Sequence, residues 1–399
     1  MARMLTTFLL TLTLSIAPLK AADKPSFDAI LAEADGQTIY FNAWGGDETI
    51  NGYIAWVGEE VQDRFGITLK HVKLADTAEA VARVLAEKTA GREDGGSIDL
   101  IWINGENFAS MKQQDLLFGP FVPDLPNFAH VDVAGKPTTV LDFTVPTEGM
   151  EAPWGMAQFV FIHDTASVAE PPRSIQDLLA WAQANPGRFT HPSPPDFIGS
   201  TFLKHLMITY IDDPAVLQEP VDKVDFTEVT AGLWQALEEV RPALWRQGET
   251  YPANGPGLHQ LLDDGEVDFS MAFNPAEASA AISAGNLPDS VRTFIPEAGS
   301  IGNTHFVAIP FNAAHKAGAQ VVADFLMSPE AQAKKQDPEG WGDWTVLDVA
   351  GLDADDRARF EGLPRGIATL SPEELTPVLP EPHPSLMTRI DAEWLRRFS

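Results

Sequence analysis

Apolar positions along this chain alternate between the spacing of a strand and the spacing of a helix. In the first part, strand-length apolar runs are separated by stretches whose apolar residues recur every three or four positions. The elements predicted there are strands over 38–43, 67–72 and 98–103 and helices over 50–65 and 75–90. Strands separated by amphipathic helices indicate βαβ units and a parallel sheet.

A second set of strands and helices follows a lapse of this pattern between Pro146 and Trp154. Ser174 and Asp177 resemble a capping box at the start of one of its helices. The elements predicted in this part are strands over 159–162, 267–273, 293–295 and 305–309 and helices over 175–184, from 199, over 276–284, 314–327, from 328 and over 386–398. The chain is therefore expected to form two α/β units.

Four junctions between strands and helices share small, amide or acidic residues. They are residues 44–47, 104–107, 199–201 and 274–277. Ligands of open α/β sheets bind beyond the carboxyl ends of the strands, where helix N-termini supply N–H donors. Gly45 and Gly46 would let a ligand approach the backbone. Each junction is also compatible with an ordinary turn or cap, but their recurrence in both units favours a ligand cleft.

The sequence does not decide the roles of the aromatic residues and the histidines. Trp154 follows the aperiodic segment and suits a core position and a ligand wall equally well. The histidines do not have the spacing of metal ligands, so His259, His305 and His315 are expected to be surface or core residues. No metal site is predicted.

The composition of the chain excludes one class of partner and indicates a cellular compartment. Lys and Arg number 27 against 57 Asp and Glu, a net charge of −30, which excludes the basic face that nucleic acid requires. Residues 1–22 are predicted to be a cleavable signal peptide, with Arg3, an apolar run over 8–17, and Ala21 and Ala22 near the cleavage point. Because the chain has no Cys, neither disulfides nor a lipoprotein anchor is expected, and the protein should be soluble in the periplasm.

Signatures of catalysis and of cofactor binding are lacking. The sequence has no Cys nucleophile, no Gly-x-Ser-x-Gly elbow, no phosphate-binding or dinucleotide-binding glycine motif and no His-Glu-x-x-His pair. No cofactor is therefore predicted. A secreted hydrolase stays an alternative, because the two carboxylates of such an enzyme need not be close in sequence.

Several segments carry a resemblance to a known class. "IDLIWINGENFASMKQQDLLFGPF", "APWGMAQFVFIHD", "GEVDFSMAFNPAEA" and "HFVAIPFNAAHKAGAQVVADFLMSPEAQ" resemble, in that order, the extracellular solute-binding proteins of ABC importers in the type II periplasmic binding protein class. The strand ending "YFNAWGG" is similar to an uncharacterised branch sometimes described as thiamine-related. The resemblance implies a two-lobe α/β fold, with lobe one over 37–152 and 302–345 and lobe two over 153–301 and 346–399.

The resemblance also implies a mechanism and a site. A monomer would capture a small solute by hinge closure and deliver it to a membrane permease; a sensory ligand-binding module would use the same physics. The positions that correspond to the cleft are Trp44, Gly45, Gly46, Asn104, Glu106, Trp154, Gln158, Ser200, Thr201, Asn274 and Glu277. Carboxylates near aromatic rings place an organic cation first among the ligands, a sugar second and an oxyanion third. Iron is not expected, because the four tyrosines include no adjacent pair.

Overall fold

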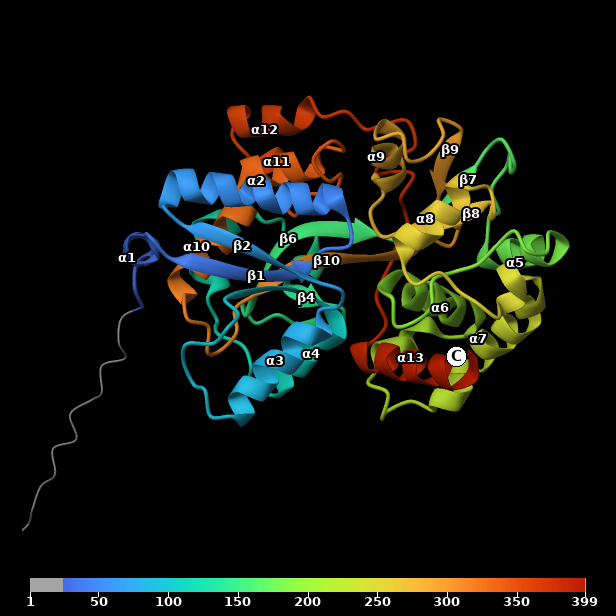
Figure 1. Ribbon diagram of the computed structural model, residues 1–399, viewed down its shortest axis with the longest axis horizontal. Helices are drawn as coiled ribbons and strands as arrows, with labels where there is room; N and C mark the ends of the chain where they lie inside the picture. Colours follow the sequence, from blue (N-terminus) through green and yellow to red (C-terminus); the bar gives the residue numbers. More distant parts are fainter. Residues whose placement is uncertain (1–23, 399) are drawn as a thin grey trace, which may run out of the picture.

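Two β-sheets organise residues 24–398, the part of the chain that this computed structural model describes, into two lobes (Figure 1). The predicted signal peptide over 1–22 lies outside the described residues. Among the described helices, none has the length and apolar character needed to cross a membrane.

The sheet of the first lobe is parallel at one side and antiparallel at the other. Its strands are β1 (Thr38–Trp44), β2 (Thr68–Leu74), β3 (Leu100–Ile103), β6 (Glu151–Gln158) and β10 (Ser300–Ala308). β1 pairs in parallel with β2 and β3, as predicted, whereas β10 runs antiparallel to both β3 and β6. β11 (Val378–Leu379) joins the start of β10, and β4 (Leu141–Asp142) and β5 (Val145–Pro146) form a separate short ribbon.

Helices cover both faces of this sheet. They are α1 (Phe27–Ala34), α2 (Glu48–Phe65), α3 (Ala78–Thr89), α4 (Gly105–Gln113), α10 (Lys316–Leu326), α11 (Pro329–Gln336) and α12 (Ala354–Glu361). In Figure 1, α2, α11 and α12 lie on one side of the strands and α3 and α4 on the other. The sheet is therefore buried on both faces.

Helix α2 shows how the sequence sets these elements. The carboxylate of Asp47 accepts a hydrogen bond from the Ile50 N–H at 2.9 Å, which caps the start of the helix. At its other end Gly66 adopts the left-handed conformation, with φ of 69°, and stops it. Ile54, Val57 and Val61, apolar residues at helical spacing between these caps, are buried, and the helix is present as predicted.

Strand β6 was missed by the sequence pattern. Seven of its eight residues are buried, so it lacks the alternation of a half-exposed strand. It also contains Pro153 and Gly155, which favour an interpretation as a loop. Only its pairing with β10 makes the segment a strand.

The second lobe is built on a small antiparallel sheet. β7 (Val160–Asp164) lies between β8 (Phe269–Ala272) and β9 (Val291–Phe294) and is antiparallel to both, unlike the parallel pairs of the first lobe. The helices intervene in a block between β7 and β8 instead of alternating with each strand. They are α5 (Ile175–Ala184), α6 (Phe197–Tyr210), α7 (Phe226–Val240) and α8 (Gly255–Asp263), with α9 (Glu277–Ser283) before β9 and α13 (Pro384–Phe398) at the end.

Separate apolar cores mark the lobes, and β10 runs from one to the other: Ile301 packs in the second core and Val307 in the first. The predicted lobe boundaries stay predictions. Leu352 and Phe360 pack in the first core, whereas Ala368 packs in the second. We therefore propose that the last crossing lies near residues 363–368 and not at 345.

Candidate functional site

Two adjoining cavities lie between the lobes. Their volumes are about 230 and 410 Å³. Six residues line both of them: Trp44, Ile50, Pro256, Asn274, Glu277 and Trp341. The first lobe contributes the carboxyl ends of β1, β2 and β3, and the second contributes the starts of α6 and α8 and the segment after β8. The pair is thus an interlobe cleft of the kind that the strand-to-helix junctions predicted.

Glu106 lies in the smaller cavity, in the first turn of α4. Gly105, with φ of 59°, precedes it, and a Cβ at that position would lie 2.7 Å from the Phe143 ring. Asn107 donates to Glu106 Oε1 at 3.2 Å, but the buried Oε2 has no hydrogen-bond partner among the residues that the structure describes. Burial raises the pKa of Glu106 to about 7. A cationic donor bound in this cavity would satisfy the unpaired oxygen and favour the ionised carboxylate.

Asp196 faces the smaller cavity from the second lobe. It caps α6 by accepting hydrogen bonds from the N–H groups of Ile198 and Gly199 at 3.1 and 3.2 Å. Burial raises the pKa of Asp196 to about 6 despite these bonds, and the charges of Asp76 and Asp391 raise it further. Carboxyl groups of both lobes therefore converge on this cavity.

Aromatic rings from both lobes also line the smaller cavity. Trp102 and Trp341 lie with their ring centroids 5.3 Å apart, edge to face. Phe197 and Phe273 come from the second lobe, with centroids 5.1 Å apart. Rings present their negative faces to a bound cation, so they reinforce the carboxylates.

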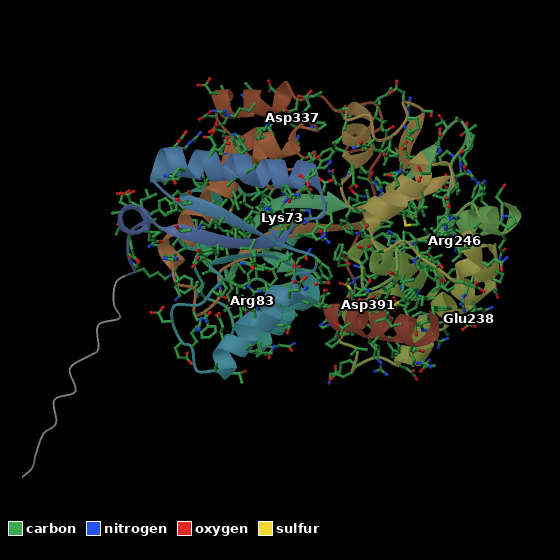
Figure 2. The ribbon with its side chains drawn as sticks, viewed as in Figure 1. Lys73, Arg83, Glu238, Arg246, Asp337 and Asp391 are labelled. Carbon is green, nitrogen blue, oxygen red and sulfur yellow. The ribbon has the colours of Figure 1, made fainter. Side chains whose placement is uncertain are left out.

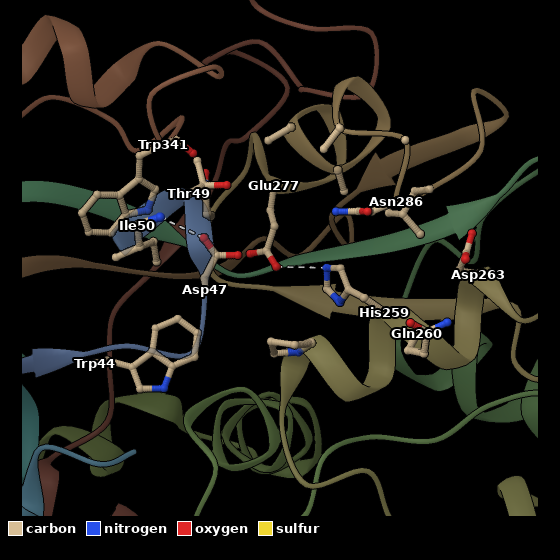
Figure 3. A pocket seen from close by; sticks show the side chains of 17 residues that line it. Trp44, Asp47, Thr49, Ile50, His259, Gln260, Asp263, Glu277, Asn286 and Trp341 are labelled. Carbon is tan, nitrogen blue, oxygen red and sulfur yellow. Dashed lines mark hydrogen bonds and ion pairs between the residues drawn. The ribbon is translucent and has the colours of Figure 1, made fainter. Parts of the chain in front are cut away.

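A histidine and two carboxylates dominate the larger cavity. Figure 3 shows the carboxyl groups of Asp47 and Glu277 facing each other, with His259 on the other side of Glu277. His259 Nε2 lies 3.0 Å from Glu277 Oε1. Burial lowers the pKa of His259, but the charge and hydrogen bond of Glu277, the Gly255 carbonyl and the charge of Asp47 together outweigh it, so the net pKa is raised. The pair therefore carries opposite charges when the histidine is protonated.

These residues resemble a serine triad in reverse order. Ser270 Oγ lies 2.9 Å from His259 Nδ1, while Glu277 lies at the opposite ring nitrogen. In a hydrolase the hydroxyl faces the substrate and the carboxylate is buried behind the histidine. Here Ser270 is fully buried and it is Glu277 that lines the cavity. The arrangement orients a carboxylate toward a ligand and offers no nucleophile.

Five of the residues predicted from the sequence line the cavities: Trp44, Asn104, Glu106, Asn274 and Glu277. Asn274 also fixes a neighbour, because its amide donates to the Trp341 carbonyl at 2.8 Å. The structure thus brings together junctions that lie up to 230 positions apart in the chain.

The two glycines after β1 have a different role from the predicted one. A Cβ on Gly45 would lie 2.6 Å from the Lys73 side chain, and one on Gly46 would lie 2.4 Å from the Trp44 ring. Neither glycine lines a cavity. Their small size lets β2 and the Trp44 ring pack against the backbone, so the glycines position Trp44.

Trp154 and Gln158 are interior residues of β6. Trp154 is fully buried, and the Lys335 ammonium lies between its ring and that of Trp341, 4.2 and 3.9 Å from the centroids. Gln158 donates to Ser300 Oγ at 2.9 Å and to the Leu375 carbonyl at 2.6 Å. Neither lines a cavity; Trp154 supports Trp341 from behind.

Ser200 and Thr201 are also buried away from the cavities. The helix was predicted to start near Gly199, but it starts at Phe197, behind its cap Asp196. The junction that faces the cleft is therefore three to four residues earlier. Ser200 donates to Asp391 Oδ1 at 2.5 Å, which ties α6 to α13.

Other lining residues were missed. Asp76 and Thr77 follow β2 and occupy a strand-to-helix junction of the predicted type, whereas Gly255 and Pro256 follow Asn254, the N-cap of α8, which no strand directly precedes. His259 lines the larger cavity and His305 the smaller one, a location that the sequence did not predict for either residue. The sequence spacing of the histidines argued against a metal-binding pair. It could not show that they line a cleft, because distant segments of the chain form that cleft.

The lining is strongly acidic. Its carboxylates are Asp47, Asp76, Glu106, Asp196, Asp263 and Glu277. None of the described residues that line the two cavities is Lys or Arg. Within residues 24–398, no cluster of three or more His, Cys, Asp or Glu side chains is arranged to hold a metal ion.

The sequence and the fold were compared with known proteins. The sequence model described as "Bacterial extracellular solute-binding protein" matches residues 56–358. Protein YnjB of Escherichia coli (strain K12) is 45% identical over 378 residues, which cover 95% of each chain.

Solved structures of periplasmic binding proteins share the fold. AfuA of Actinobacillus pleuropneumoniae, with fructose-6-phosphate bound, superposes with a TM-score of 0.63 at 11% identity, over 91% of this chain and 98% of AfuA. The spermidine/putrescine ABC transporter substrate-binding protein PotD of Streptococcus pneumoniae gives a TM-score of 0.62 at 13% identity, over 91% of this chain and 98% of PotD.

Proposed function

Since the chain belongs to the family of bacterial extracellular solute-binding proteins and is the substrate-binding component of an ABC importer, we propose that it captures a small organic cation between its lobes. Its partners are a small solute and an ABC permease. The cavity-lining residues Trp44, Asn104, Glu106, Asn274 and Glu277 are proposed as ligand contacts.

The acidic lining carries this proposal. Six carboxylates and no Lys or Arg line the cavities among the described residues, so an anion would be repelled by the carboxylates and would find no Lys or Arg to pair with. A neutral sugar could donate a hydroxyl hydrogen bond to the unpaired Glu106 oxygen, but it would leave the negative charges of the cavities uncompensated. A cation compensates these charges, and the Trp44 and Trp341 rings add cation–π attraction. The order of ligands is thus cation, sugar, oxyanion.

We further propose that the ligand leaves unchanged. The reversed arrangement of Ser270, His259 and Glu277 supports this, because the hydroxyl faces away from the cavities. Membership of the family places the protein outside the cytoplasm. We propose the periplasm as the compartment, reached through cleavage of the signal peptide over 1–22.

A thermal-shift screen tests the ligand class. Thiamine, choline, aliphatic amines, sugars and oxyanions would be added in turn to the purified protein at about pH 8, where Glu106 is ionised. Binding to the folded state raises the unfolding midpoint by mass action, so cations should raise it and sugars should not. The compound should be recovered unchanged by mass spectrometry. A shift with sugars or oxyanions alone would refute the cation, and conversion of the bound compound would refute pure binding.

A further inference from the structure

Five of the six carboxylates of the cleft fall into two separate groups, and the sixth, Asp263, lines only the larger cavity. Asp76, Glu106 and Asp196, here named the first acid group, line only the smaller cavity. Asp47 and Glu277, the second acid group, line the larger cavity, and Glu277 also reaches the junction of the two. The interactions follow the same division: the charge of Asp76 acts on Glu106 and Asp196, and that of Glu277 acts on Asp47.

Each group contains carboxyl groups from both lobes. In the first group, Asp76 and Glu106 follow β2 and β3, whereas Asp196 caps α6 of the second lobe. Asp391 of α13, on the side of the second lobe that adjoins the first (Figure 2), adds its charge behind them. In the second group, Asp47 caps α2 and Glu277 begins α9. Like charges across the cleft oppose closure at two places.

An apolar stretch lies between the two groups. Four of the six residues that line both cavities are apolar or aromatic, namely Trp44, Ile50, Pro256 and Trp341, and the other two are Asn274 and Glu277. His259 compensates part of the second group, but it lies on the far side of Glu277 from Asp47 (Figure 3). Along the cleft, the first acid group is therefore followed by an apolar wall and then by the second acid group.

We propose that the solute is an organic dication whose two cationic groups are joined by an apolar spacer. One cationic group would lie among the first acid group and the other between Asp47 and Glu277, so that each removes one repulsion between the lobes. This inference rests on the proposed function, because it specifies the kind of cation that the same site binds.

Pairs of amines that differ in one charge test the proposal. Putrescine, cadaverine and hexamethylenediamine would each be compared by calorimetry with the monoamine in which a methyl group replaces one ammonium, such as n-pentylamine for putrescine. At about pH 8 at least one diamine should bind about a hundredfold more tightly than its monoamine, since a charge pair within an interface contributes strongly when desolvated.

Two variants locate the cationic groups. Asp47→Asn retains the cap of α2 and should weaken the diamine about tenfold while leaving the monoamine, held by the first acid group, nearly unchanged. Glu106→Gln should weaken both. Glu48→Gln removes an exposed acid one residue from Asp47 that lines neither cavity, and should change neither affinity.

The outcomes separate the two claims. Equal affinity for every diamine and its monoamine, or tight binding of a monocation such as choline with no diamine binding, would overturn the dication and leave the cation site standing. Binding of sugars or oxyanions alone would refute the proposed function itself. A diamine preference that survives Asp47→Asn would also contradict the placement of the second cationic group.

Discussion

Among single residues, burial determines which ionisable groups have shifted pKa values and should therefore change protonation when a cation binds. Glu106 and Asp196 lie in the cleft with pKa values raised to about 7 and about 6, chiefly by desolvation. A bound cation supplies the opposite charge that desolvation removed, so binding of a cation and loss of these protons are linked.

Affinity for a cation should therefore depend on pH. Both carboxyl groups are largely protonated at about pH 5 and ionised at about pH 8, so affinity should rise about a hundredfold over that range. Protonation of His259 on the acidic side acts in the same direction, because it adds positive charge near Glu277. Calorimetry at several pH values measures this, and Glu106→Gln should flatten the profile.

The stability of the ligand-free protein should change in the opposite sense. A carboxyl group whose folded pKa is raised contributes stability below its unfolded pKa, and this contribution is lost as pH rises through the folded value of about 7. Ligand-induced stabilisation should thus be largest at high pH. An affinity independent of pH would contradict the role given to both carboxyl groups.

Lys335 and Asp343 form a buried ion pair behind the cleft wall. The ammonium contacts the rings of Trp154 and Trp341, and burial lowers the pKa of Lys335 to about 8. Lys335→Met should lower the free energy of unfolding by about 3–5 kcal/mol, because Asp343 is left buried without its main partner. Adding Asp343→Asn should restore much of the loss in chemical denaturation. A double variant no more stable than the single one would contradict this explanation.

At the scale of secondary structure, helix N-termini build the cleft. α2, α4, α6 and α8 begin at its edge, each behind an Asp or Asn at the N-cap. The positive end of a helix favours a nearby anion. Here the anions are the protein's own carboxylates, so the helices help to keep charge in the cleft for a cationic ligand.

Two substitutions of Asp196 distinguish its role as the N-cap of α6 from the role of its negative charge. Asp196→Asn can still accept the hydrogen bonds from Ile198 and Gly199, so the free energy of unfolding should change little. Asp196→Ala loses the cap and should cost about 1 kcal/mol. Both variants should weaken cation binding, which calorimetry compares with thermal unfolding. Binding that is weakened only by the alanine would show that the cap matters and the charge does not.

At the scale of the whole molecule, few segments link the lobes. β10 runs through both cores, and α13 of the second lobe packs beside α4 of the first. A ligand that contacts carboxyl groups of both lobes has differential affinity for the closed form and shifts the population toward it.

Closure should be visible in solution. The radius of gyration from small-angle X-ray scattering should fall when a cation saturates the site, because the lobes approach each other. Glu106→Gln at the same ligand concentration should show a smaller decrease, since less of it is bound. An unchanged radius at proven saturation would contradict ligand-driven closure.

Local sequence patterns predicted most of the helices and strands and the class of the fold, but not β6. The caps at Asp47 and Ser174 and the periodicity of α2 and α5 are local, and local patterns sufficed to find these helices. The ordered segments also indicated two lobes. Trp44, Glu106 and Glu277 could be predicted to line a cleft because the carboxyl ends of strands meet there.

Which side chains enter the cleft depends on packing between segments far apart in the chain. Trp154, Ser200 and Thr201 are buried because distant segments pack around them. Gly46 has no side chain, which leaves room for the Trp44 ring. His259 and Trp341 gain their positions from contacts with Glu277 and Asn274. Carboxylates of the two lobes face each other because the folded cores hold distant segments of the chain at set distances. Such distances leave no local pattern in the sequence.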